Sequence, residues 1–195
     1  MTTPRYRRAS ASKIEQTAIL RDVEIPEIVA RRRDRVRAKF TSYSWVVVLN
    51  QDCDLDLDHH ARHGTSPKVG GNPVRKDKLL GSLQLCRAFP QDELLAGTYL
   101  RPLAEATKFG TSESRTILAN RHERFHLLSI EAPLLATPLI LDFKLIVPVA
   151  ADYLERWIRG HRESRVAVLR PPFRDRLTQR FSNYYSRIAE PGEDE

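Results

Sequence analysis

Runs of apolar residues along the chain predict a series of short β-strands. Residues 45–49 read Trp-Val-Val-Val-Leu with no polar alternation, which is typical of a strand buried on both faces. Apolar and polar positions alternate over residues 79–88, which indicates a second strand. Further strands are predicted over residues 125–130, 139–147 and 165–169.

The clearest predicted helix lies near the C-terminus. It is predicted to start at Pro171-Pro172, since proline is favoured at the first helical position, where a missing N–H group costs no hydrogen bond. Its apolar stripe consists of Phe173, Leu177, Phe181, Tyr184 and Ile188 at helical spacing. Shorter helices are predicted over 14–19, with Ser10 or Ser12 as the cap, and over 91–96 and 152–158. Residues 28–40 remain ambiguous between a basic helix and an edge strand.

This order of elements predicts an α+β fold. We expect a small curved sheet, or an SH3-like β-barrel, closed by the C-terminal amphipathic helix. One globular domain should span residues 13–189, between a flexible basic arm at 1–12 and an acidic tail at 190–195.

Composition narrows the class of protein. Hydrophobic residues make up 41% of the 195 positions, which is typical of a globular chain. No apolar run approaches the ~18 residues of a membrane span, and no apolar segment follows the basic N-terminus as in a secretory signal. Two cysteines, Cys53 and Cys86, are too few for a disulfide scaffold. We therefore expect a cytoplasmic protein with reduced thiols and no membrane partner.

The net charge of +7 points to an anionic partner. Arginine dominates the positive charge, and its planar fork suits phosphate groups. RNA or DNA is therefore the expected partner, with a solvated basic surface as the alternative. The candidate nucleic-acid-binding residues are Arg31, Arg32, Arg33, Arg35, Arg174, Arg176, Arg180 and Arg187.

Residues 50–78 are rich in Asp, His and Gly, lack periodicity, and are predicted to form a long functional loop. A calcium EF-hand is excluded, because a loop starting at Asp52 has Leu57 in place of glycine and His63 in place of glutamate. Zinc remains an open cofactor, with Cys53, His59 and His63 as candidate ligands. His59 and His63 are the pair with suitable spacing.

Two other interpretations of Cys53 stay open. It could be a nucleophile paired with a distant His126 and flanked by Asp52 and Asp54, although neighbouring carboxylates disfavour a thiolate. Alternatively, Cys53 is a small core residue, and the adjacent aspartates cap backbone amides.

Residues 45–55, Trp-Val-Val-Val-Leu-Asn-Gln-Asp-Cys-Asp-Leu, resemble the "VVLSQDCDL" signature of a family of small bacterial proteins. Three later segments are similar to the same family: Asn120 with residues 123–128, residues 139–143, and residues 179–188. The chain differs from the pattern at Asn50, where serine is expected, and at Leu127, where an aromatic residue is usual. Its length and strand order are similar to the SH3-like barrels of MazF/PemK ribonuclease toxins, a likeness of fold alone.

Three functional hypotheses follow. The leading one is a nucleic-acid-associated accessory protein in a bacterial defence or toxin–antitoxin system. The second is a metal- or cysteine-dependent hydrolase that uses Cys53, Asp52, Asp54 and His126. The third is an adaptor that docks on a larger protein partner.

Overall fold

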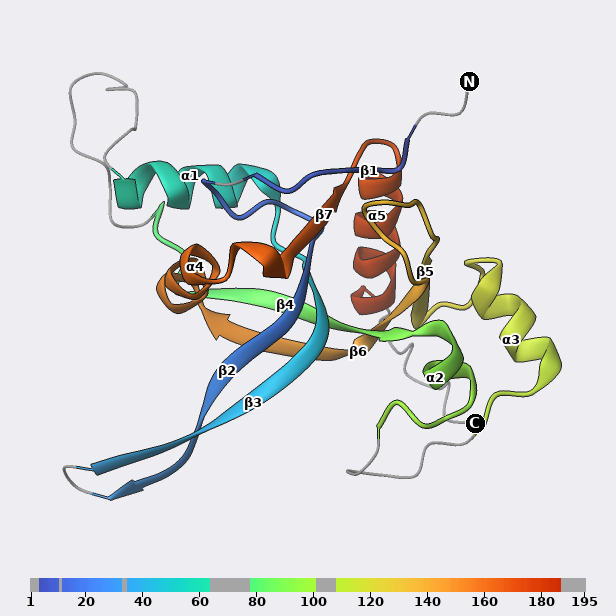
Figure 1. Cartoon of the computed structure of the whole chain (residues 1–195), viewed down its shortest axis with the longest axis horizontal. Coiled ribbons are helices and arrows are strands. Elements are labelled where there is room, and N and C mark those ends of the chain that lie inside the picture. The colour runs from blue at the N-terminus through green and yellow to red at the C-terminus, as the bar shows by residue number, and fades with distance from the viewer. Residues whose placement is uncertain (1–3, 11, 33–34, 64–77, 101–107, 187–195) are drawn as a thin grey trace, which may run out of the picture.

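The computed structural model describes residues 4–10, 12–32, 35–63, 78–100 and 108–186, and for residues 28–36 it describes no side chains. A seven-stranded antiparallel sheet forms the centre of the molecule, in the order β1-β7-β2-β3-β4-β6-β5 (Figure 1). Its strands are β1 (Tyr6–Arg7), β2 (Ala18–Arg32), β3 (Arg35–Val48), β4 (Ser82–Pro90), β5 (Phe125–Leu128), β6 (Leu139–Ala150) and β7 (Arg165–Leu169). The α+β class is confirmed.

The sheet is open, with β1 and β5 at its two edges. The edges approach each other through side chains: the Tyr6 hydroxyl donates to the carbonyl oxygen of Ser129, just beyond β5, at 2.8 Å. The N–H group of Arg5 donates to a carboxylate oxygen of Glu131 at 2.8 Å. The two edges are therefore joined without a continuous backbone ladder, and a closed barrel is not shown.

In the described ranges, five α-helices surround the sheet: α1 (Asp52–His63), α2 (Gln91–Leu95), α3 (Thr111–Leu118), α4 (Ala151–Gly160) and α5 (Phe173–Tyr185). A short 3-10 turn, η2 (Arg162–Ser164), precedes β7. The predictions of α2, α4 and α5 are confirmed. The long loop expected from residue 50 is wrong over α1, where acidic residues begin the helix and basic residues end it, which complements the helix dipole. The helix expected over 14–19 is also wrong, since β2 begins at Ala18.

Both faces of the sheet are covered by apolar layers. Val46 and Val48 join the cluster beneath α1 and α4, whereas Val47 joins the cluster beneath α5. This alternation confirms that residues 45–49 include a strand buried on both faces. A third cluster packs α2 and α3 at the far end of the sheet.

Within residues 1–12, where a flexible arm is expected, Tyr6 and Arg7 form strand β1 of the sheet. Tyr6 pairs with Leu169 of β7, and its side chain is 2% exposed. Burial of this aromatic ring explains why the segment is held in place. The acidic tail at 190–195 lies outside the described residues.

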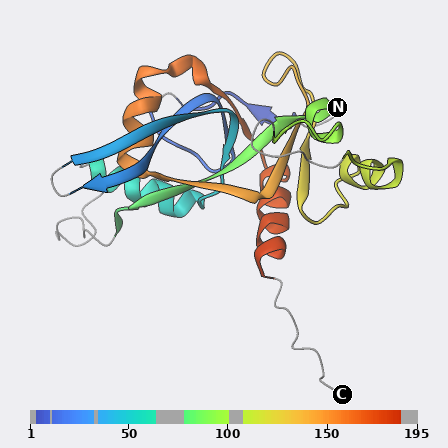
Figure 2. The same ribbon diagram turned by 90° about the horizontal axis from the view of Figure 1, so that it is seen from below.

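The hairpin of β2 and β3 extends well beyond the rest of the molecule (Figures 1 and 2). The ambiguous residues 28–40 therefore belong to this strand pair where described. Phe40 on it is 59% exposed. Within the described part of the chain, no helix is both long and apolar enough to cross a membrane.

Candidate functional site

Two hollows lie on opposite flanks of α5. The first, here called the His126 hollow, has a volume of about 480 Å³ and is formed by β1, β5, the end of α3 and α5. The second, the Cys53 hollow, has a volume of about 350 Å³ and lies between α5 and the start of α1. Gln179 of α5 lines both hollows.

The His126 hollow combines an apolar wall with positive charge. Tyr6, Leu128, Leu169 and Phe173 supply apolar surface, and the guanidinium group of Arg5 lies 5.7 Å from the centre of the Phe173 ring. Arg176 and Arg180 of α5 also line it. Among the described residues that line this hollow, none is acidic.

His126 belongs to β5 and is 7% exposed. Burial, together with the nearby Arg180, lowers the pKa of His126 to about 3, so the ring is neutral at physiological pH. Among the described residues, none forms a hydrogen bond with its Nδ1 atom.

Arg180 has a structural role that its sequence position did not reveal. Its guanidinium donates to the carbonyl oxygens of Asn120, His122 and Phe125 at 2.5–2.8 Å. Burial lowers the pKa of Arg180, and its Nε atom has no partner within the described part of the chain. Arg180 thus ties α5 to β5 and the segment before it, because its two Nη atoms donate to three backbone carbonyl oxygens.

The other candidate arginines fall into three groups. Arg174 is paired with Asp52 at 2.5 Å and with Asp175 at 3.1 Å, so its charge is compensated. Arg176 is exposed at the rim of the His126 hollow. Arg31, Arg32 and Arg35 lie on the distal hairpin with no side chain described, and Arg33 and Arg187 lie outside the described residues.

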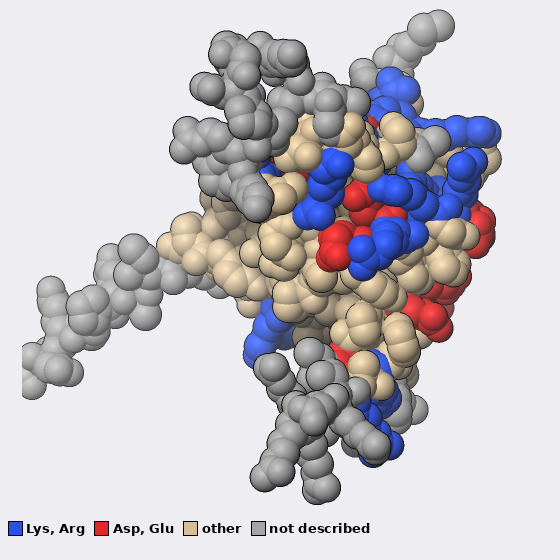
Figure 3. All heavy atoms as spheres, turned by 90° about the vertical axis from the view of Figure 1, so that its left-hand side faces the viewer, with Lys and Arg blue, Asp and Glu red and all other residues tan. Residues whose placement is uncertain are grey.

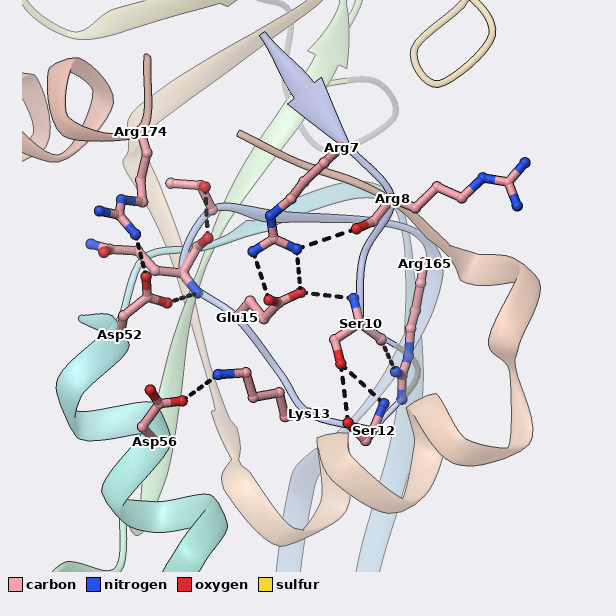
Figure 4. A network of polar contacts seen from close by, with 12 residues as sticks. Arg7, Arg8, Ser10, Ser12, Lys13, Glu15, Asp52, Asp56, Arg165 and Arg174 are labelled. Atoms are coloured by element: carbon pink, nitrogen blue, oxygen red, sulfur yellow. Dashed lines mark hydrogen bonds and ion pairs between the residues drawn. The ribbon is translucent and has the colours of Figure 1, made fainter. Parts of the chain in front are cut away.

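Asp52, at the start of α1, holds three parts of the chain together beside the Cys53 hollow (Figure 4). One carboxylate oxygen accepts the N–H group of Gln16 at 2.9 Å, and the other pairs with Arg174. The Gln16 side chain in turn donates to the hydroxyl of Thr178 on α5 at 3.1 Å. Asp52 therefore caps a backbone amide, as one interpretation of the sequence predicted.

A buried carboxylate fixes the neighbouring N-terminal segment. Glu15 is 6% exposed and accepts hydrogen bonds from Arg7 at 2.7 and 3.2 Å and from the N–H group of Ser10 at 2.7 Å (Figure 4). Burial raises the pKa of Glu15, but the bonds from Arg7 and Ser10 outweigh it and leave the pKa lowered. The ionised Glu15 thus anchors the segment that leads to Gln16.

The structure does not form the predicted Cys–His pair. Cys53 is exposed in the Cys53 hollow, whereas His126 lines the hollow on the other flank of α5. Asp54 is exposed, and its Oδ1 atom lies 3.8 Å from the Sγ atom of Cys53. The interpretation of Cys53 as a core residue is also wrong, because its side chain faces solvent; Cys86 is the buried thiol.

The predicted metal ligands are only partly brought together. His59 and His63 lie near Glu155 of α4, with one donor atom of each residue within 4.8 Å of the others. Cys53 lines a different hollow and is not in this group. Burial and the neighbouring His63 lower the pKa of His59. Sequence reasoning missed Glu155, which lies on a helix that was predicted, because nothing in the sequence indicated that α4 faces α1.

Comparisons of the chain with protein-family models, with curated proteins and with solved structures find no match.

Proposed function

We propose that this protein binds single-stranded nucleic acid and holds one nucleotide in the His126 hollow. The observation that carries the proposal is the lining of this hollow, which joins aromatic surface to arginine and includes no acidic residue among those described. Nucleic-acid sites without sequence preference use the same combination: aromatic rings stack on bases and cations track the backbone.

The size and the lining of the hollow suit a nucleotide. Its volume of about 480 Å³ lies within the ~300–1,000 Å³ range of ligand pockets. Arg5 and Phe173 offer a stacked cation and ring at its wall, and Arg176 at the rim is placed for a phosphate group. Asn120 and Gln179 also line the hollow and bring polar side chains to it.

Elsewhere on the surface, positive side chains lie beside carboxylates that offset their charge. On the face shown in Figure 3, lysine and arginine side chains lie beside aspartate and glutamate side chains. Arg156 of α4 is likewise paired, with Asp152 at 3.0 Å. We therefore expect the His126 hollow and the arginine-rich hairpin to make the main contacts. We also propose a role in a bacterial defence or toxin–antitoxin system, on the basis of the sequence resemblance.

Fluorescence anisotropy with labelled single- and double-stranded RNA and DNA, over a salt series, tests the proposal. Arg176→Gln should weaken binding to single strands and reduce the slope of log affinity against log salt by about 0.7, the value of one phosphate contact. Arg156→Gln is the matched control, because it removes the same charge from an ion-paired site outside the hollow.

Binding that is absent at low salt, or that falls equally in both variants, would contradict the proposal. Cys53→Ala should bind as the wild type does, since Cys53 lies outside the His126 hollow. Loss of a nucleic-acid-cleaving activity in that variant would instead support the hydrolase.

A further inference from the structure

The helices α1 and α4 lie next to each other on one side of the sheet (Figure 1). His59 and His63 are four residues apart on α1, so they share one face of that helix. Glu155 of α4 faces them, and one donor atom from each of the three residues lies within 4.8 Å of the others. We propose that His59, His63 and Glu155 form a binding site for a divalent transition metal, with Zn²⁺ as the best-suited ion.

The three donors are held by well-packed elements. Asp58, in the same turn of α1 as His59, is 8% exposed and accepts the N–H group of Leu80 at 2.7 Å and the Nε–H group of Arg62 at 2.8 Å. On α4, Leu154 and Ile158 are buried in the same cluster as Leu55 of α1. The two helices therefore present their donors from fixed backbones, and only side-chain rotation is needed.

The donor set matches zinc chemistry. Two imidazole nitrogens and one carboxylate oxygen are common zinc ligands, and three protein ligands leave a fourth position for water. Donors about 2.0–2.1 Å from a tetrahedral zinc lie roughly 3.4 Å apart. The Nε2 atom of His63 and the Oε1 atom of Glu155 are already 2.5 Å apart, so the ion would separate this pair and draw in His59.

A cation already competes for the site. Arg159 places Nη2 at 2.7 Å from the Glu155 carboxylate and 3.4 Å from Nε2 of His63. The side chain of Arg159 is 56% exposed, so it can turn into solvent at little cost, as exposed ion pairs generally can. Because Arg159 competes with the ion for Glu155 and His63, replacing it with an uncharged residue should tighten metal binding.

Titration of metal-stripped full-length protein with Zn²⁺ by calorimetry tests the site, with thermal unfolding as a second readout. We expect one Zn²⁺ per chain and a rise in melting temperature with zinc concentration. His59→Ala should weaken binding at least about tenfold, because even groups that only support a ligand cost that much when mutated, and Glu155→Gln should do the same. Arg159→Gln should tighten it. Cys53→Ala is the control and should bind zinc as the wild type does.

His59 is the preferred position to change. Within the described part of the chain its ring contacts are with His60 and His63, and the hydrogen bonds of Asp58 and Glu155 are made with other residues. Circular dichroism without metal tests whether each variant is folded. The Co²⁺ absorption spectrum of the wild type and of Arg159→Gln supplies a readout that does not depend on ligand deletion. No zinc binding, equal binding by His59→Ala, or a Co²⁺–thiolate band lost in Cys53→Ala would each overturn the proposal.

Discussion

Asp142 and Arg180 could be taken for functional groups in the sequence, but both have structural roles. Asp142 is completely buried and binds Arg124 through two hydrogen bonds, at 2.6 and 2.7 Å. It also accepts the N–H group of Lys144 at 3.1 Å. Arg180 is likewise occupied by backbone carbonyls. A charged side chain in a motif can therefore be fixed by its own fold, because buried charge must be paired or hydrogen-bonded.

His126 should make stability depend on pH. Its pKa is lowered to about 3 in the folded protein, against about 6.5 when unfolded. Between these values the unfolded chain binds an extra proton, so the free energy of unfolding decreases as pH falls from about 6.5, by at most about 1.4 kcal/mol per unit. His126→Gln should lose this part of the pH dependence. Urea unfolding of both proteins at several pH values measures this dependence. If the free energy of unfolding changed with pH by the same amount in both proteins, the prediction would be contradicted.

At the scale of elements, Asn120 joins α3 to the edge strand β5. Its side chain accepts the N–H group of Leu127 at 2.6 Å and donates to the carbonyl oxygen of Leu127 at 3.1 Å. These bonds satisfy the backbone N–H and carbonyl groups of Leu127 at the sheet edge, as pairing with a further strand would. Asn120 also has a φ of 54°, in the left-handed region that asparagine tolerates better than alanine.

Asn120→Ala should therefore lower the free energy of unfolding by about 3 kcal/mol, from two hydrogen bonds and backbone strain. Asn120→Gly is the matched control, since it loses the same bonds but relieves the strain, and should cost about 1 kcal/mol less. Urea unfolding gives both values, and hydrogen exchange should show faster exchange of the Leu127 amide in each variant. Equal stability of the two variants would mean that the backbone conformation carries no strain.

Elements with a marked apolar pattern could be predicted from the sequence, and polar ones could not. The strand over 165–169 was predicted at its observed bounds, and α5 was predicted from its apolar stripe. Helix α1 was missed because, of its twelve residues, the buried ones are Leu55 and Asp58, too few to give a periodic signal. The hairpin remained ambiguous because its distal half is largely exposed where described and shows no clear alternation.

At the scale of the whole molecule, both hollows are built by segments from opposite ends of the chain. Arg5 and Tyr6 meet Phe173 and Arg176 in the His126 hollow. Gln16 meets Thr178 beside the Cys53 hollow. No local pattern encodes such contacts, which arise when β1 pairs with β7 and α5 packs beneath the sheet. The candidate arginines could be named from the sequence. The sequence could not tell which of them bind carboxylates or backbone carbonyls within the fold.

The protruding hairpin allows its charge to be tested apart from the core. Replacing residues 28–38 by Asn-Gly would join the paired residues Glu27 and Lys39 through a two-residue turn. The change removes five arginines and one aspartate. Because the described residues nearest the cut, 37–40, are exposed, the free energy of unfolding should change by less than about 1 kcal/mol, the range of surface changes.

Affinity for single-stranded nucleic acid should fall in the shortened protein, and the slope of log affinity against log salt should decrease by up to about 3.5, or about 0.7 for each arginine that contacts phosphate. A full-length variant with glutamine at the five arginine positions separates charge from length, and it should match the shortened protein. If both variants bind as the wild type does, the hairpin charge is a solvated surface and binding is confined to the His126 hollow. If only the shortened protein binds weakly, the strand pair contacts the ligand through its backbone or apolar side chains, because charge alone would affect both.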